Sequence, residues 1–224
     1  MKKFELTSEF VTFLGKTLFR IKALVSFGDV AEGELGGFIE RENNLDQSGD
    51  AWVYGDAWVY GDAWVYGDAQ VCGDARVYGD AQVCGDAQVC GDARVYGDAQ
   101  VCGDARVCGD ARVYGDAQVC GDARVYGNAW VCGDAQVCGD AQVFGNAWVQ
   151  NCRDYSATSC FGSENRTTTF FRTKDGGISV RCGCFYGTLR EFREKVKERH
   201  GDSRLAKEYL MLADLMEFRL SKDE

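Results

Sequence analysis

The stretch ARVYGDAQVCGDARVCGD, residues 93–110, contains three copies of the pattern Ala-x-Val-x-Gly-Asp. The same hexapeptide, ending in Gly-Asp or Gly-Asn, fills residues 51–146 as sixteen copies, with a seventeenth beginning at Ala147 and a degenerate one at 45–50. Ala and Val stand two positions apart, so both point to one side of a strand, and Gly-Asp supplies a bend. Each hexapeptide is therefore predicted to form one short strand and one corner of a solenoid.

The two variable positions of the hexapeptide repeat on a longer period of 18 residues. Arg76, Arg94 and Arg112 follow one another at this spacing, and a second column consists of Gln82, Gln100, Gln118 and Gln136. Like residues stack in this way if three hexapeptides make one coil of a triangular parallel β-helix. About six coils would form a rod roughly 29 Å long, since neighbouring strands lie about 4.8 Å apart. Ala and Val are predicted to fill the interior, and the Trp/Gln/Arg, Tyr/Cys and Asp columns to face outward.

The pattern resembles that of the hexapeptide-repeat superfamily of left-handed β-helices, in which an aliphatic residue recurs every six positions with a small residue two before it. The matching positions are Val53, Val59 and Val65 with Ala51, Ala57 and Ala63. The resemblance implies the left hand of the coil and a homotrimer. Within that superfamily, the segments 27–30, 36–40 and 44–45 are similar to those of a group of uncharacterised bacterial and phage proteins, which implies no particular activity.

The residues on either side of the repeats do not follow the hexapeptide pattern, which predicts a cap at each end of the rod. Residues 1–44 are expected to form an N-terminal β cap, with a hairpin of 9–14 and 18–23 that turns at Gly15-Lys16. The β-helix itself is predicted to span 45–152. Residues 153–224 are expected to form a C-terminal α+β module with a hairpin of 167–172 and 178–182.

Two helices are predicted to complete this module. Thr188-Leu189-Arg190-Glu191 is a capping box that opens a helix to about Arg199, and Gly201 can end that helix. Ser203 can cap a second helix that runs through Leu220.

The composition is that of a soluble globular protein, with 46% hydrophobic and 27% charged residues and a net charge of −10. No segment approaches a membrane span and no export signal is evident, so we expect a cytoplasmic protein with reduced thiols. Residues 51–146 carry 14 Asp against 5 Arg. Such an acidic rod is expected to bind neither nucleic acid nor membranes, although it could mimic DNA or bind cations. We expect the aspartate side chains to cap backbone amides in the turns.

Enzymatic chemistry on the rod is not expected. Acyltransferases of the resembled superfamily use a coil histidine as general base, and its carbonic anhydrases bind metal through three histidines, whereas His200 in the tail is the only histidine here. The stacked rod cysteines could in principle bind soft metals, but a small side chain suited to a flat strand face is the favoured interpretation. Cys152, Cys160, Cys182 and Cys184 in the tail lack the paired spacing of structural zinc sites. We therefore expect no catalytic residue, no metal and no cofactor.

Two surfaces are candidates for ligand binding. The first is a donor-rich cluster in the tail that could receive a small anion such as a phosphate, made of Arg166, Thr167, Thr168, Thr169, Arg172, Lys174 and Arg181. The second is a column of guanidinium and phenol groups on the rod, made of Arg76, Arg94 and Arg112 with Tyr78, Tyr96 and Tyr114. The alternative interpretation of each surface is that its side chains are simply exposed to solvent and bind no ligand.

These features predict a non-catalytic binding or assembly scaffold that forms a homo-oligomer, with a trimer favoured. The oligomer interface is placed on the uncharged side that carries Gln82, Gln100, Gln118 and Gln136 beside Cys84, Cys102, Cys120 and Cys138. The side that carries the arginine and tyrosine columns is the alternative, because these residue types are enriched at interfaces. One alternative is a phage-type sequestering or mimic protein that takes up a small anionic nucleotide or engages a basic partner. Another is an enzyme whose site lies in the C-terminal module.

Overall fold

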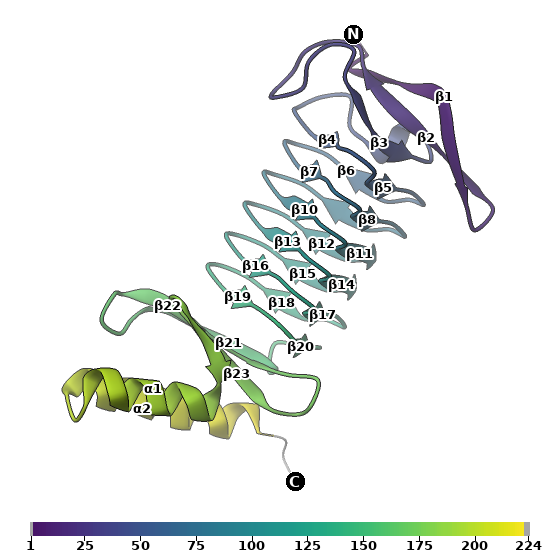
Figure 1. The fold of residues 1–224 in the computed structure, drawn as a ribbon. Helices are drawn as coiled ribbons and strands as arrows, with labels where there is room; N and C mark the ends of the chain where they lie inside the picture. Colours follow the sequence, from purple (N-terminus) through teal and green to yellow (C-terminus); the bar gives the residue numbers. More distant parts are fainter. Residues whose placement is uncertain (1, 222–224) are drawn as a thin grey trace.

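Each hexapeptide forms a short strand, and strands 18 residues apart pair in parallel around a three-sided rod (Figure 1). The computed structural model describes residues 2–221. Register pairs such as Arg94 with Arg112, Gln100 with Gln118, and Gln88 with Arg106 confirm the 18-residue period. The fold is mainly β, with about six coils, and the predicted triangular arrangement is confirmed.

The three sides of the rod are three parallel sheets, named here by their outward residues. The Arg/Tyr face consists of β5 (Trp58–Val59), β8 (Arg76–Val77), β11 (Arg94–Gly97), β14 (Arg112–Gly115), β17 (Trp130–Val131) and β20 (Trp148–Val149). The Gln/Cys face consists of β6 (Trp64–Val65), β9 (Gln82–Val83), β12 (Gln100–Val101), β15 (Gln118–Val119) and β18 (Gln136–Val137). The mixed face consists of β4 (Trp52–Val53), β7 (Gln70–Val71), β10 (Gln88–Cys90), β13 (Arg106–Cys108), β16 (Arg124–Val125) and β19 (Gln142–Val143).

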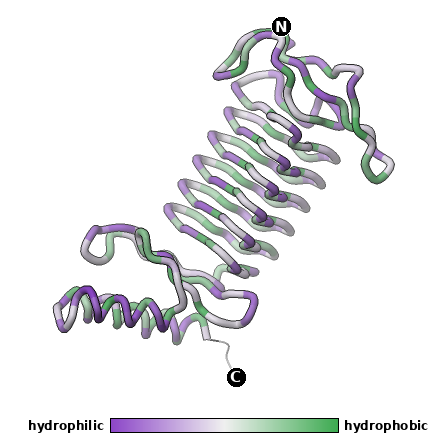
Figure 2. Tube along the Cα trace, in the orientation of Figure 1, coloured by the Kyte–Doolittle hydropathy of each residue, from purple (hydrophilic) through white to green (hydrophobic). Residues whose placement is uncertain are grey.

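The interior of the rod contains the alanine and valine of every hexapeptide. Val95, Val101 and Val107 have no exposed surface, and the repeat alanines are equally buried. Figure 2 shows hydrophilic positions recurring at the corners of successive coils. The predicted division into a small apolar interior and a polar exterior is confirmed along the middle of the rod.

The corners are held by the backbone rather than by the aspartate side chains. The N–H of Asp80 donates to the carbonyl of Gly97 in the next coil at 3.0 Å, and the same bond recurs from Asp68 and Asp74. Among the described corner aspartates, Asp68 alone accepts a backbone N–H with its side chain, from Asp50 at 3.0 Å. The expected capping by aspartate side chains is therefore wrong for most corners. The amides two residues further along the chain, such as those of Gln82 and Arg94, already donate to carbonyls of the next coil at 2.9 Å.

The N-terminal cap extends the sheet of the Arg/Tyr face. β1 (Phe4–Phe13) and β2 (Lys16–Ala23) form an antiparallel hairpin, β2 pairs with β3 (Leu35–Ile39), and β3 pairs in parallel with β5. A 3₁₀ helix, Glu42–Asn44, leads into the rod. The predicted hairpin is confirmed, but it is longer and turns at Leu14-Gly15, where both residues have positive φ angles of 49° and 77°. Two consecutive positive φ angles are typical of the tight turn whose twist matches that of paired strands.

Lys3 closes the first coil. Its buried ammonium donates to the carbonyls of Ser48, Gly49 and Ala51 at 3.3, 3.2 and 2.9 Å. Burial lowers the pKa of Lys3, while Asp46, Asp50 and Asp68 oppose this shift. These bonds satisfy carbonyl groups that would otherwise be exposed at the open end of the solenoid.

The N-terminal cap also buries two aromatic residues that were expected to face solvent. Trp52 is fully buried between Phe4 and Phe27, with ring centroids 6.1 and 5.4 Å away. Tyr60 is only 9% exposed because Phe13 of the hairpin packs against it. The prediction that these aromatic side chains face solvent is therefore wrong. It assumed that all coils are equivalent, whereas the first coils lie beneath the cap.

The C-terminal module is an antiparallel sheet covered by two helices. The sheet consists of β21 (Tyr155–Phe161), β22 (Arg166–Arg172), β23 (Ile178–Cys182) and β24 (Phe185–Thr188), and the helices are α1 (Leu189–His200) and α2 (Arg204–Leu220). Thr188 and Glu191 form the predicted capping box, and Ser203 caps α2. The hairpin of β22 and β23 and both helices are confirmed, and β21 and β24 are additional strands.

β22 connects the rod to the helices because its side chains alternate between two cores. Phe171 packs into the interior of the rod, whereas Phe170 packs against the helices with Val180 and Phe192. An isolated bridge between Ala147 and Thr173 attaches the module to the last coil. Within residues 2–221, no helix is both long enough and apolar enough to cross a membrane.

Candidate functional site

The Arg/Tyr face brings together all six residues of the candidate surface on the rod. Arg76, Arg94 and Arg112 lie in register on β8, β11 and β14. Beside them, the rings of Tyr60, Tyr78, Tyr96 and Tyr114 form a continuous stack with centroids 4.9 Å apart and planes within 2° of parallel. The predicted column of guanidinium and phenol groups therefore exists as a flat ladder.

Two of the three guanidinium groups of this ladder contact aromatic rings, and none of the three pairs with a carboxylate of the described residues. The guanidinium carbon of Arg76 lies 4.4 Å from the ring centroid of Trp58, and that of Arg112 lies 5.0 Å from Trp130. The ion pairs formed by the described residues do not include Arg76, Arg94 or Arg112. Their N–H donors are therefore available to an external acceptor.

Both ends of the ladder are bounded by the caps. At the N-terminal end, Phe13 packs edge-on against Trp58 at 5.1 Å, and the neighbouring Leu14 is 84% exposed. At the C-terminal end, the ammonium of Lys174 lies 3.6 Å from the ring centroid of Trp130. Burial and the charge of Arg112 lower the pKa of Lys174. The ladder is thus a defined patch with an apolar tip at one end and a cation at the other.

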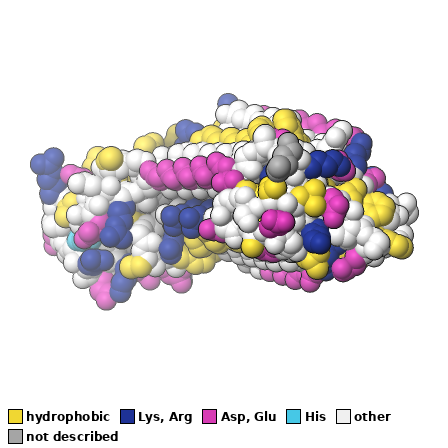
Figure 3. Space-filling view, turned by 90° about the horizontal axis from the view of Figure 1, so that it is seen from above, with side chains coloured by type: hydrophobic (Ala, Val, Ile, Leu, Met, Phe, Trp, Pro, Cys, Tyr) yellow, Lys and Arg dark blue, Asp and Glu magenta, His cyan; other side chains and the backbone are white. Residues whose placement is uncertain are grey.

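The phenols of the ladder are neutral near physiological pH. Burial raises the pKa of Tyr78 and Tyr96, although the neighbouring arginines oppose the shift. Each phenol keeps a hydroxyl hydrogen, so the ladder offers neutral donors beside its fixed positive charges. Figure 3 shows a continuous row of acidic side chains along one corner of the rod, with a group of basic side chains beside it.

The seven candidate residues of the tail do not converge on one site. Thr167, Thr169 and Arg181 lie on the side of the sheet that faces the rod, whereas Arg166, Thr168 and Arg172 lie on the side that faces the helices. Successive residues of a strand point to opposite faces, so a run such as Arg166–Arg172 is divided between them. One small anion cannot contact the whole set.

Most donors of this set are also engaged inside the protein. Thr169 is buried and its hydroxyl oxygen accepts the N–H of Gln142 at 3.0 Å, while the hydroxyl of buried Thr168 donates to Cys182 at 3.2 Å. Thr167 contacts the hydroxyl of Ser159 at 3.1 Å.

The basic members of the set are engaged in the same way, with the exception of Arg166. Arg172 donates to the carbonyls of Leu220 and Ser221 and pairs with buried Asp154 at 3.2 Å. Arg181 donates to Gln142 at 3.2 Å and lies 4.8 Å from the ring centroid of Phe144. Arg166 is mostly exposed, and its nearest carboxylate, Glu164, is 3.9 Å away.

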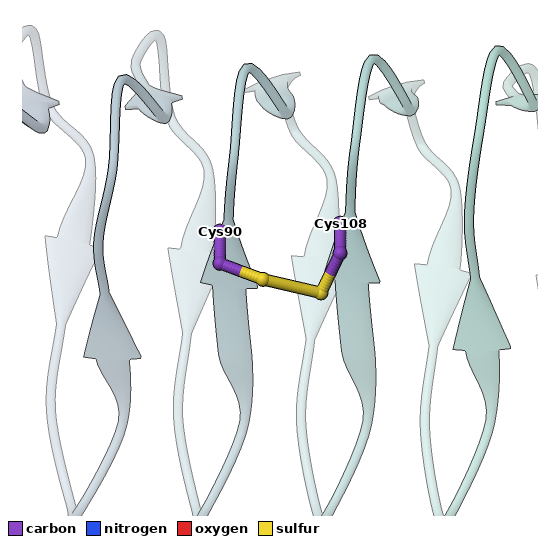
Figure 4. The surroundings of a disulfide bond; sticks show 2 residues. All are labelled: Cys90 and Cys108. Atoms are coloured by element: carbon purple, nitrogen blue, oxygen red, sulfur yellow. A yellow bond between two sulfur atoms is a disulfide. The ribbon is translucent and has the colours of Figure 1, made fainter.

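The cysteines of the rod differ in their pairing. On the mixed face, Cys90 and Cys108 form a disulfide between neighbouring strands (Figure 4). Their Cα atoms are 4.7 Å apart because residues 18 apart lie directly side by side, within the separation that a disulfide requires. The expectation of reduced thiols is wrong for this pair, whereas the other cysteines are free.

The free thiols of the Gln/Cys face are close neighbours within their column. Burial, together with neighbouring Cys138, raises the pKa of Cys120 to about 11. Such thiols are protonated at neutral pH and are weak metal ligands. Among the described residues, no group of three or more His, Cys, Asp and Glu side chains is arranged to hold a metal ion.

Sequence reasoning missed a cavity of about 540 Å³ in the C-terminal module. Its walls come from α1, Tyr209 of α2 and the ends of the four strands β21, β22, β23 and β24, which are separated in the sequence. The available signal was the basic pair Lys195 and Arg199, which stand one turn apart on the same side of a predicted helix.

Comparison with known protein families identifies the type of repeat. The family model of the YdcK Beta solenoid repeat matches residues 69–85, 87–103, 99–115, 105–119 and 117–133. No curated protein matches the chain. The matched segments all lie in the rod, whose strands form three parallel sheets of stacked coils. The chain is a β-solenoid repeat protein whose middle coils are similar to the YdcK repeat.

Proposed function

We propose that the chain is a non-catalytic binding scaffold that presents the Arg/Tyr face to a protein partner. One observation supports this proposal: three guanidinium groups in register lie beside stacked phenols, without an ion pair among the described residues. Tyr, Trp and Arg contribute a disproportionate share of binding energy at protein interfaces. The rigid coils hold these side chains in place, so little conformational entropy is lost when a partner binds.

The chemistry of the face indicates what the partner must offer. Guanidinium groups bind carboxylates through paired hydrogen bonds, and the tyrosine and tryptophan rings favour aromatic or apolar contacts. Aspartates at the corners on either side, such as Asp92 and Asp98 around Arg94, repel a broad anionic polymer such as nucleic acid. We therefore expect a protein surface whose acidic and aromatic side chains fit the narrow ladder between the corners.

A Glu/Tyr random copolymer is a suitable probe, with polyglutamate as the probe that lacks aromatic groups. Arg94→Gln with Arg112→Gln is expected to weaken copolymer binding at least about tenfold, as measured by biolayer interferometry. The matched control is Arg106→Gln with Arg124→Gln, which removes the same charge from neighbouring strands of the mixed face. It is expected to change the Kd less than about twofold.

Three outcomes would contradict the proposal. First, the unmodified chain could fail to bind the copolymer. Second, both pairs of substitutions could weaken copolymer binding equally. Third, the chain could bind polyglutamate as tightly as the copolymer. The second would mean that binding follows overall charge, and the third that the phenols take no part.

The finer predictions made from the sequence, some of them from the superfamily resemblance, belong to this proposal. They are membership of the left-handed hexapeptide-repeat β-helices, a homotrimer, a cytoplasmic location and the absence of acetyl transfer and carbon dioxide hydration. A trimer would present three Arg/Tyr faces and increase the avidity for a partner with repeated acidic surfaces. Native mass spectrometry of freshly purified protein measures the number of subunits directly.

A further inference from the structure

The cavity of about 540 Å³ in the C-terminal module is separate from the Arg/Tyr face. It lies between the β21–β22 turn, the β23–β24 turn, α1 and Tyr209 of α2. Small organic molecules occupy cavities of roughly 300–1,000 Å³. The volume therefore suits a ligand larger than a simple ion.

Aromatic side chains from four elements form the walls of the cavity. They are Phe161 of β21, Phe185 of β24, Phe192 of α1 and Tyr209 of α2. Tyr209 packs edge-on against Phe161 at 5.9 Å and against Phe192 at 5.8 Å, and Phe185 lies 5.6 Å from Phe192. Edge-on rings present both faces and edges, an arrangement that accommodates a further aromatic ring.

Tyr209 is held at the wall by a turn that only glycine can form. Its hydroxyl oxygen accepts the N–H of Ser163 at 3.2 Å, and a Cβ atom on Gly162 would collide with that hydroxyl. Gly162 also has a φ of +74°, in the left-handed region. Burial raises the pKa of Tyr209, so the phenol keeps its hydrogen and can donate it.

The rim of the cavity is positively charged. Arg166, Lys195, Arg199 and His200 line it, against one carboxylate, Glu164, which lies 3.9 Å from Arg166. Lys195 pairs with Glu198 at 2.8 Å, whereas the ion pairs of the described residues do not include Arg199. Figure 3 shows the only histidine of the chain, in cyan, next to basic side chains of this module.

The helix dipole accounts for only part of this charge. Basic residues are favoured in the last turn of a helix, which accounts for the positions of Arg199 and His200 in α1. Arg166 belongs to β22 and Lys195 lies further back in α1, so neither is needed there for the dipole. Basic groups from a strand and a helix therefore converge on one apolar opening.

We propose that this cavity binds a small aromatic anion, with the ring system between the aromatic walls and a phosphate or carboxylate at the basic rim. The aromatic walls supply the apolar contact, and Arg166, Lys195 and Arg199 supply charge-assisted hydrogen bonds to the head group.

Three probes separate the contributions of the ring and the charge. 1-Naphthyl phosphate carries both, 1-naphthol carries only the ring, and inorganic phosphate carries only the charge. In calorimetric titrations of the full chain, 1-naphthyl phosphate is expected to bind at least about tenfold more tightly than either. Equal affinity for inorganic phosphate, equal affinity for 1-naphthol, or no binding of 1-naphthyl phosphate would each overturn the proposal.

Substitutions at the rim locate the site. Lys195→Gln with Arg199→Gln is expected to weaken 1-naphthyl phosphate at least about tenfold and to leave 1-naphthol unchanged. The matched control is Arg190→Gln with Lys197→Gln, which removes the same charge from α1 at residues that do not line the cavity. Equal weakening by both pairs would contradict the proposed location, and circular dichroism checks that each variant is folded.

Discussion

At the scale of the residue, the corner glycines decide whether coils can stack. Gly97 has a φ of +74°, and a Cβ atom there would lie 3.0 Å from the nitrogen of Gly115 in the next coil. Gly139 has a similar φ of +64°, but a Cβ atom would meet nothing within 4 Å. The two positions therefore separate the effect of backbone conformation from that of close coil packing.

Replacing each glycine by alanine tests this difference. Gly139→Ala is expected to reduce the free energy of unfolding by about 1–2 kcal/mol, because the left-handed region is strained for residues with a Cβ atom. Gly97→Ala is expected to reduce it by about 2–4 kcal/mol, since the coils must also move apart. Urea denaturation measures both values, and equal losses would show that the close approach does not matter.

The inward and outward positions of one strand offer a second test at this scale. Val101 is fully buried and Gln100, its neighbour on β12, is exposed. Val101→Asp is expected to reduce the free energy of unfolding by more than about 4 kcal/mol, because a carboxylate would be buried without a partner. Gln100→Asp is the matched control, and a change within about 1 kcal/mol is expected. Similar thermal unfolding of both variants would be inconsistent with the interior described here.

At the scale of the element, the stacked tyrosines couple the stability of the rod to pH. Burial raises the pKa of Tyr60, Tyr78 and Tyr96 above the ordinary value of 10.0. The folded state therefore retains protons that the unfolded state releases. This contribution to stability is complete below about pH 10 and is lost as the pH rises through the higher pKa values of the folded state.

The free energy of unfolding is accordingly expected to fall steeply above pH 10, as measured by urea denaturation. The pKa values of Cys72, Cys102 and Cys120 are also raised, so the free energy of unfolding is expected to start falling near pH 9. Tyr78→Phe with Tyr96→Phe should make the slope above pH 10 shallower, because two of the shifted phenols are removed. Absorbance at 295 nm follows ionisation of the native phenols, and titration at the pH of free tyrosine would refute this prediction.

At the scale of the whole molecule, the Gln/Cys face is the predicted surface for self-association. Its Gln82, Gln100, Gln118 and Gln136 carry no charge, and Trp64 at its N-terminal end is 41% exposed and stacks on Tyr66 at 4.0 Å. The Arg/Tyr face is bounded at both ends by the caps, which makes it a less continuous surface for a second rod. Charge is depleted at the centre of stable interfaces.

Lysines placed on this face should therefore dissociate the oligomer. Gln100→Lys with Gln118→Lys is expected to convert the assembly to monomers, because stacked ammonium groups would be buried at its centre. Light scattering measures the mass, and Gln70→Lys with Gln88→Lys on the mixed face is the matched control. An unchanged mass would mean that the subunits do not associate through the Gln/Cys face.

The sequence by itself determined the rod and its ladder of side chains. Each strand pairs with the strand 18 residues away, so the neighbours of Arg94 can be counted directly along the chain. The β1–β2 and β22–β23 hairpins and both helices were also predictable, because turn residues and capping boxes act locally. These features require no knowledge of how distant segments pack.

Only the tertiary structure decided how the N-terminal cap and the C-terminal module pack against the rod, and how the strands and helices of that module pack against one another. The N-terminal hairpin covers Trp52 and Tyr60, and the two faces of the module's sheet divide six of the seven tail residues between rod and helices. The cavity walls likewise come from elements without a shared period. Long-range packing sets these contacts, and it depends on the shapes of several elements at once, whereas the coil repeat depends on one spacing.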